Sequence, residues 1–162
     1  MTRKTSRLMM AALPALLLAA GTSIAQAQTG RAHLGVRGMY NFDIEEFGLG
    51  AQATIPVGTF LQFYPSFDYF FIDPGNLFAF NADLKYALTG SNFNWLYLGG
   101  GLNVTRAESG GASDSQTGLN LFAGVESLRG SIHPFGEIRF TVGDGSSGQV
   151  VFGLNFTLGR HQ

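Results

Sequence analysis

Apolar side chains recur at every second position along most of the chain, in eight separate stretches. A period of two places successive side chains on opposite faces of a β-strand, whereas a helix needs apolar residues three and four positions apart. Short runs rich in Gly, Asn, Asp and Ser separate the stretches, as turns do. The pattern predicts an all-β fold. The expected strands lie near 33–42, 47–57, 61–71, 77–87, 95–105, 118–128, 132–142 and 149–158.

The two faces of these expected strands differ in chemistry. One face carries bulky aliphatic and aromatic residues and no charge, while the opposite face is rich in Gly and Asn. Which face points outward therefore decides the class of protein. Every charged residue that falls within a strand lies on the polar face, and these residues are Arg37, Asp68, Asp83, Lys85, Glu126, Glu137 and Arg139.

The apolar face is suited to an exterior in contact with lipid. A soluble barrel turns its apolar face inward and needs a charged exterior, which the polar face here does not provide. The apolar side chains are also too bulky for the interior of eight strands. Strands of about ten residues cross a bilayer when they are tilted, and backbone in hydrocarbon requires a closed barrel. We therefore expect an eight-stranded antiparallel up-and-down transmembrane β-barrel in the outer membrane of a Gram-negative cell envelope.

The composition excludes several functional classes. The chain has 162 residues, which is enough for one domain of this kind. It contains no cysteine, which excludes disulfides, thiolate metal ligands and a cysteine nucleophile. Its net charge of -1 provides no basic surface for a nucleic-acid partner.

The first 27 residues have the order of a secretory signal peptide. A basic stretch at 3–7 precedes an apolar stretch at 8–20, and Ala25–Ala27 follows as a small-x-small cleavage site. The apolar stretch contains Pro14 and is shorter than the roughly 20 residues that a transmembrane helix needs. We expect export through the secretory pathway, cleavage after residue 27, and a barrel domain over 28–162.

Several strand segments resemble the small eight-stranded outer-membrane β-barrels, the family of outer membrane protein A and outer membrane protein X. They are Leu61–Tyr69, Leu98–Leu102, Phe135–Arg139 and Val151–Leu158. The resemblance covers 28–162 and implies that outer-membrane lipids surround the barrel. It also implies that the last strand is an assembly signal for the barrel-assembly machinery. The residues at the matching positions of that signal are Gly153, Phe156 and Leu158.

We expect both termini to lie on the periplasmic side. The turns at 58–60, 88–94 and 129–131 then face the periplasm, and the loops at 43–46, 72–76, 106–117 and 143–148 face outside. The outer loops carry a net charge of -6, from one Arg106 against Asp43, Glu45, Glu46, Asp73, Glu108, Asp114 and Asp144. Such a rim could hold divalent cations, and a solvated rim without a ligand is the simpler interpretation.

The expected lumen is narrow, and its three cations and four carboxylates must be paired to be tolerated there. We expect Arg37 to pair with Asp83 and the neighbouring carboxylates. Two interpretations stay open, a fixed network that plugs the lumen and a leaky one that passes small polar solutes, for which the inward glycines leave room. A two-residue turn at 129–130 would place Glu126 opposite His133, Phe122 opposite Glu137 and Asn120 opposite Arg139.

The sequence predicts no catalytic, cofactor or metal site. Lipid A deacylases and palmitoyl transferases on this architecture need Ser, His and a carboxylate in hydrogen-bond range, and the lipid face offers Ser127 without such partners. His33 and His133 face inward at the periplasmic end, His161 lies in the tail, and lone histidines rarely bind zinc. The sequence favours a monomeric protein with a structural or general envelope role. A narrow porin-like channel is the alternative, and a lipid A-modifying enzyme is the third possibility.

Overall fold

Eight strands make up the body of the protein. The computed structural model describes residues 31–73, 75–88, 95–109 and 112–159, so the predicted signal peptide at 1–27 lies outside the described residues. Where the structure describes a whole connection between two strands, that connection is short. The strands are β1 His33–Asn41, β2 Glu46–Pro56, β3 Leu61–Phe70, β4 Asn76–Ala87, β5 Leu96–Ser109, β6 Ala112–Glu126, β7 Ile132–Gly143 and β8 Ser147–Thr157.

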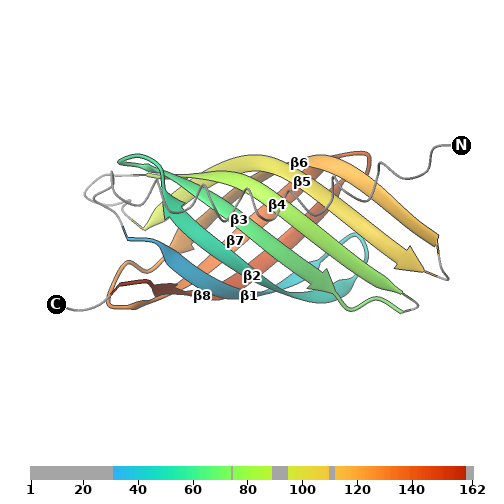
Figure 1. Cartoon of the computed structure of the whole chain (residues 1–162), viewed down its shortest axis with the longest axis horizontal. Coiled ribbons are helices and arrows are strands. Elements are labelled where there is room, and N and C mark those ends of the chain that lie inside the picture. Colours follow the sequence, from blue (N-terminus) through green and yellow to red (C-terminus); the bar gives the residue numbers. More distant parts are fainter. Residues whose placement is uncertain (1–30, 74, 89–94, 110–111, 160–162) are drawn as a thin grey trace, which may run out of the picture.

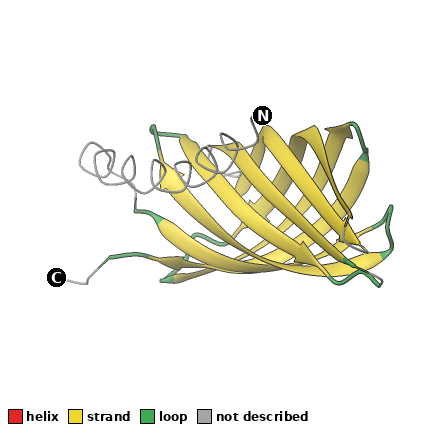
Figure 2. Cartoon of the chain, turned by 45° about the vertical axis from the view of Figure 1, so that its right-hand side comes forward, coloured by secondary structure: helices red, strands yellow, loops and turns green. Residues whose placement is uncertain are grey.

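The strands form a closed antiparallel barrel (Figure 1). Each strand pairs with its neighbour in sequence, and β1 pairs with β8 from His33↔Thr157 to Asn41↔Gln149. Figure 2 shows that strands form the wall of the barrel. Among the described residues no helix is long and apolar enough to cross a membrane. The predicted up-and-down β-barrel of eight strands is thus confirmed. We call the end at His33 and Thr157 the proximal end and the opposite end the distal end.

The outer surface of the barrel carries exposed apolar side chains on every strand. Exposed side chains include Leu102 on β5, Leu121 on β6 and Phe152 on β8, each about three-fifths exposed. Charged and amide side chains of the same strands are buried inside. Continuous exposed apolar surface of this extent is unfavourable in water and marks contact with lipid or a partner. The outward and inward faces are those that the two-residue period predicts.

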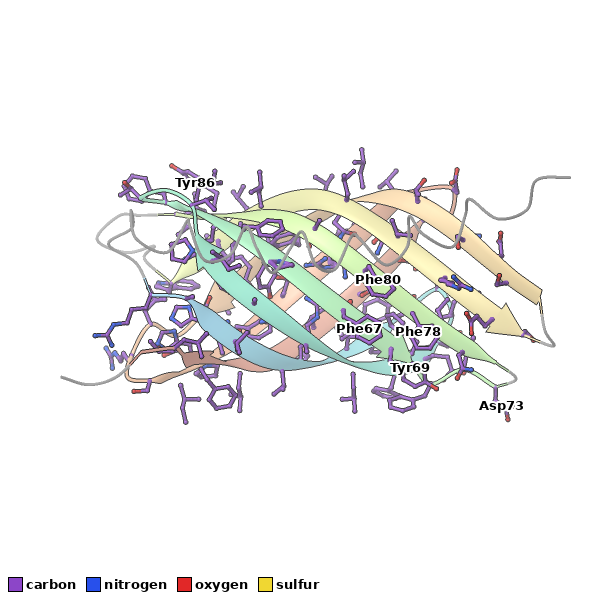
Figure 3. All side chains as sticks on the ribbon, viewed as in Figure 1. Phe67, Tyr69, Asp73, Phe78, Phe80 and Tyr86 are labelled. Carbon is purple, nitrogen blue, oxygen red and sulfur yellow. The ribbon has the colours of Figure 1, made fainter. Side chains whose placement is uncertain are left out.

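Aromatic residues lie on the apolar surface toward both ends of the barrel. Figure 3 shows Phe67, Tyr69, Phe78 and Phe80 gathered on the outside of β3 and β4 toward the distal end, while Tyr86 lies at the proximal end. The ring centroids of Phe67 and Phe80 are 4.9 Å apart, and those of Tyr69 and Phe78 are 5.3 Å apart. Paired aromatic bands flank the hydrocarbon-facing zone of transmembrane barrels, because aromatic rings suit the interface between lipid and water.

The hairpin of β5 and β6 extends beyond the other strands at the distal end (Figure 1). The ladder continues through Arg106↔Ser115 to Ser109↔Ala112, so the expected loop at 106–117 is wrong and most of it is strand. The segment is rich in Gly, Ser and Asp, which are typical of loops, and this composition led to the incorrect prediction of a loop. Backbone hydrogen bonds continue the antiparallel ladder without regard to those side chains.

The register of β6 and β7 differs from the predicted one by two residues. Glu126 lies opposite Phe135, Gly124 opposite Glu137 and Phe122 opposite Arg139. The connection at 127–131 is longer than a two-residue turn, with Gly130 at a φ of 79°. A shift of two keeps every side chain on its own face, because the side-chain period of a strand is two. The predicted inward-facing residues of β6 and β7 therefore do face inward, although the predicted pairing between the two strands was wrong.

The lipid-facing surface can be tested with the same substitution at two exposed leucines. Leu121 lies on the wall of β6 and is 61% exposed, and Leu128 lies in the connection after β6 and is 57% exposed. We expect Leu121→Arg to lower the free energy of unfolding in lipid vesicles by about 2–4 kcal/mol, and Leu128→Arg by about 0–1 kcal/mol. Urea titration of the folded protein in vesicles measures both. Equal effects at the two positions would contradict a lipid-facing wall.

Candidate functional site

The lumen contains all seven charged residues that the sequence placed on the polar face. Each of them is less than one-tenth exposed. They come from five strands, β1, β3, β4, β6 and β7. Buried apolar side chains such as Met39, Phe70 and Phe135 occupy part of the remaining interior. Buried amides and hydroxyls occupy the rest, and every one of the eight strands contributes a polar side chain. These neighbours are Gln52, Tyr64, Ser66, Asn81, Tyr97, Asn103, Asn120, Thr141 and Asn155.

Arg37 makes a two-pronged ion pair with Asp68. Its Nε donates to Asp68 Oδ1 at 2.7 Å and its Nη2 donates to Asp68 Oδ2 at 2.5 Å. Nη2 also donates to Ser66 Oγ at 2.6 Å. The expected pairing of Arg37 with Asp83 is therefore wrong. Arg37 and Asp68 both lie opposite Gly50 of β2, so the register brings these two side chains together.

A second group of charges surrounds Arg139. Its Nη1 donates to Asp83 Oδ2 at 2.6 Å and its Nε donates to Glu137 Oε1 at 2.9 Å. The guanidinium also lies over the ring of Phe122, with its Cζ 4.6 Å from the ring centroid. One cation thus compensates two carboxylates, and the aromatic face adds a weaker favourable interaction.

Lys85 compensates the remaining carboxylate. Its ammonium group donates to Glu126 Oε2 and lies 3.9 Å from the centroid of the Tyr97 ring. The hydroxyl of Tyr97 in turn donates to Glu137 Oε2 at 3.1 Å. Lys85 is therefore held between a carboxylate and an aromatic face, and Tyr97 connects it to the group around Arg139.

Inward glycines stand between the polar partners. Tyr97 and Glu137 both lie opposite Gly124, and Asp83 and Asn120 both lie opposite Gly101. In each pair the two side chains bond across the intervening strand, with Asn120 Nδ2 donating to Asp83 Oδ1 at 3.0 Å. We call such a residue a bridging glycine. The bridging glycines are Gly35, Gly50, Gly101 and Gly124.

The space above the inward glycines is filled. A Cβ on Gly124 would meet the ring of Tyr97 and lie 2.6 Å from the carbonyl oxygen of Gly136. A Cβ on Gly153 would lie 2.6 Å from Cε1 of Phe135. The expectation that inward glycines leave room for water is therefore wrong at these positions, because neighbouring side chains occupy that room.

Amide side chains join the charged groups into one network. Gln52 Nε2 donates to Asn155 Oδ1 at 2.6 Å, and Asn155 Nδ2 donates to Glu126 Oε1 at 2.8 Å. On the other side, Asn81 Nδ2 donates to Asp68 Oδ2 at 2.9 Å, and Asn120 Nδ2 donates to Asn81 Oδ1 at 2.8 Å. Asn and Gln at inward positions of the predicted strands were the sequence signal for these residues.

A hollow lies on the distal side of the network. Its volume is about 260 Å³, and its lining is mixed, with Asn41, Asn103, Thr105 and Gln149 beside Phe70. Residues of the extended β5–β6 hairpin, among them Asp114, form part of its rim. Such a hollow accommodates several water molecules or a small polar solute.

The predicted acidic rim at the distal end is partly bonded to the protein itself. Asp43 Oδ2 accepts a hydrogen bond from Gly148 N at 2.6 Å, and Arg106 Nε lies 2.8 Å from Glu108 Oε1. Asp144 Oδ2 lies 3.4 Å from the backbone N of Thr117. These carboxylates therefore have partners within the loops and strands that carry them.

The two inward histidines lie together at the proximal end. The ring centroids of His33 and His133 are 4.8 Å apart, and His133 Nδ1 is 3.7 Å from Glu126 Oε1. The expectation that these histidines lack clustered partners is wrong, because β1 and β7 both pair with β8 and bring the two rings together across it. His161 lies outside the described residues.

The three predicted assembly-signal residues lie on β8 and just after it. Gly153 faces the lumen, where a Cβ would meet the ring of Phe135. Phe156 and Leu158 face outward and are more than one-third exposed. They belong to the strand that closes the barrel against β1.

The bridging glycines can be tested by adding one methyl group. A Cβ at Gly50 would collide with Asp68 Oδ1 and lie 2.7 Å from the carbonyl oxygen of Phe67, whereas a Cβ at the outward Gly38 meets its nearest neighbour at 3.9 Å. We expect Gly50→Ala to lower the free energy of unfolding by about 1–3 kcal/mol and Gly38→Ala to leave it unchanged or raise it. Urea unfolding in vesicles distinguishes them, and a neutral Gly50→Ala would contradict the bridging role.

No protein-family model matches the chain, and no curated protein matches it. Solved structures do. The N-terminal β-barrel domain of Pseudomonas aeruginosa OprF superimposes with a TM-score of 0.66 at 13% identity, over 78% of this chain and 96% of that one. Neisserial surface protein A (NspA) gives a TM-score of 0.63 at 15% identity, over 78% and 97%. Ail, the attachment invasion locus protein of Yersinia pestis, gives 0.53 at 14% identity, over 81% and 100%.

These likenesses concern the path of the chain, since the identities are too low to carry residue roles. They agree with the closed barrel, the apolar exterior and the polar lumen described above. The chain therefore has the fold of the small eight-stranded outer-membrane β-barrels.

Proposed function

We propose that this protein is an integral outer-membrane barrel with a structural or general envelope role, and that its lumen is closed by its own polar side chains. The observation that carries the proposal is the network that joins side chains from all eight strands across the lumen. A conducting pore needs an open path, whereas here the interior groups bond to one another.

The energetics of buried charge support a fixed plug. Arg37, Arg139 and Asp83 are at most 2% exposed, and removing one partner of such a pair leaves an uncompensated charge in a poorly solvated interior. Opening a path for solutes would require breaking buried pairs of this kind. Tyr64, Tyr97 and Phe122 pack as a buried cluster within the same section of the lumen and add apolar bulk to the plug.

A narrow channel for small polar solutes is the second candidate. The distal hollow of about 260 Å³ supports it, because its mixed polar lining provides an entry from one end. The network lies between this hollow and the proximal end, so conduction would depend on movement of the network. Porin-like passage is therefore the alternative to a plug.

We propose no catalytic role. Among the described residues, no serine or threonine hydroxyl is hydrogen-bonded to a histidine, as a nucleophile and its base would be. The partners we propose are outer-membrane lipids on the apolar wall, and the barrel-assembly machinery acting on β8 through Gly153, Phe156 and Leu158. We propose that the protein is monomeric.

The stability of the plug can be measured against a matched surface pair. Arg37 and Asp68 are buried, whereas Arg106 and Glu108 form an ion pair whose side chains are 40% and 44% exposed. We expect Arg37→Ala to lower the free energy of unfolding by about 3–5 kcal/mol and Arg106→Ala by less than about 1 kcal/mol. Fluorescence of the single tryptophan, Trp95, follows urea unfolding in vesicles. Similar small losses in both variants would contradict a stabilising plug.

Conductance separates the plug from the channel. We expect the wild-type protein to produce no discrete current steps in a planar lipid bilayer. Replacing Arg37 and Asp68 together with serine removes both charges of one pair and should open a measurable path. The Arg106→Ala/Glu108→Ala variant is the control and should stay silent. Reproducible steps from the wild-type protein would decide for the narrow channel.

A further inference from the structure

A group of metal-ligand side chains closes the proximal end of the lumen. His33 on β1, Glu126 on β6 and His133 on β7 each offer a ligand atom, and these atoms all lie within 4.8 Å of one another. Two imidazoles and one carboxylate are a ligand set that zinc adopts, with a water molecule in the fourth position.

The hydrogen bonding of His133 leaves one ring nitrogen available. Nε2 lies 3.0 Å from the carbonyl oxygen of Gly130, and a carbonyl can accept only from an N–H. The proton therefore belongs on Nε2, and Nδ1 carries a lone pair. Proteins usually orient a metal-binding histidine by a hydrogen bond from its second ring nitrogen to a carboxylate or a backbone carbonyl.

The free nitrogen points into the cluster and has no partner. His133 is 7% exposed, and its Nδ1 is buried without a hydrogen bond; Nδ1 of His33 is buried and unbonded as well. A buried polar atom without a partner is costly, so such atoms call for an explanation. At 3.7 Å, Nδ1 of His133 is too far from Glu126 Oε1 for a hydrogen bond. Ligands on a tetrahedral zinc ion lie about 3.3 Å apart, so small side-chain rotations suffice.

The surroundings orient the carboxylate. Glu126 Oε1 accepts from Asn155 Nδ2 at 2.8 Å, and Oε2 accepts from Lys85. These two hydrogen bonds keep Oε1 as the carboxylate oxygen that faces the histidines. Lys85 repels a cation, but it is already compensated by Oε2. The seven lumen charges sum to -1, from three cations and four carboxylates, so the lumen as a whole does not oppose a divalent ion.

We propose that His33, Glu126 and His133 bind one zinc ion at the proximal mouth of the barrel. The ion would join β1 and β7, which both pair with β8, to β6, which pairs with β7. The site is independent of the acidic distal rim, whose carboxylates and carbonyls suit calcium or magnesium instead.

The test uses untagged protein, refolded in detergent micelles, with zinc chloride as the probe in isothermal titration calorimetry. We expect one zinc ion per chain, and at least about a tenfold weaker affinity in His33→Ala and in His133→Ala. His161→Ala is the matched control and should bind as the wild type does. A tenfold excess of calcium should leave zinc binding unchanged. Cobalt in place of zinc should give the visible absorption bands of a tetrahedral site.

Four outcomes would overturn the proposal. They are the absence of stoichiometric zinc binding by the wild type, unchanged affinity in both His33→Ala and His133→Ala, displacement of zinc by calcium, and loss of binding in His161→Ala. Folding of each variant is checked by its shifted mobility on a detergent gel without boiling. If His133→Ala does not fold, His33→Ala decides alone, because His33 is only half-buried and the change removes no hydrogen bond that its side chain makes in the structure.

Discussion

Backbone pairing without an edge is the constraint on which the rest of the structure depends. In hydrocarbon an N–H or C=O group has no water to bond, so a sheet is tolerated only when its first and last strands pair. The ladder between β1 and β8, from His33 to Asn41, provides that closure. Closure by eight strands in turn fixes a narrow interior, which forces inward side chains from opposite walls into contact. The dense polar network is a consequence of this geometry.

The bridging glycines show how such an interior accommodates long side chains. Directly opposed residues on neighbouring strands approach closely. Two residues that both lie opposite one position of the strand between them can meet directly over that position when it carries no side chain. Gly50 between Arg37 and Asp68, and Gly124 between Tyr97 and Glu137, fulfil that condition. Glycine within a strand lowers its intrinsic stability. Here that cost is offset by the hydrogen bonds that the missing Cβ permits.

The sequence predicted which side chains face inward but not which of them touch. The two-residue period assigned Arg37 and Asp83 to the lumen correctly, and their pairing failed because it depends on register. A shift of two between β6 and β7 leaves the apolar pattern unchanged, so the pattern holds no information about it. The same limit concealed the contact of His33 with His133, which lie 100 positions apart and meet across β8. The extension of β5 and β6 was missed because small polar residues resemble a loop.

The participation of all eight strands in the interior network has a consequence for the order of assembly. A single hairpin of β3 and β4 carries Asp68, Asp83 and Lys85, but the ion-pair partners of these groups lie on β1, β7 and β6. Until the wall is complete, each of these charges must keep its hydration shell. Water is therefore expected to accompany the inner surface into the membrane and to leave the network when β8 meets β1. Dehydration of the network and closure of the wall would then be one event.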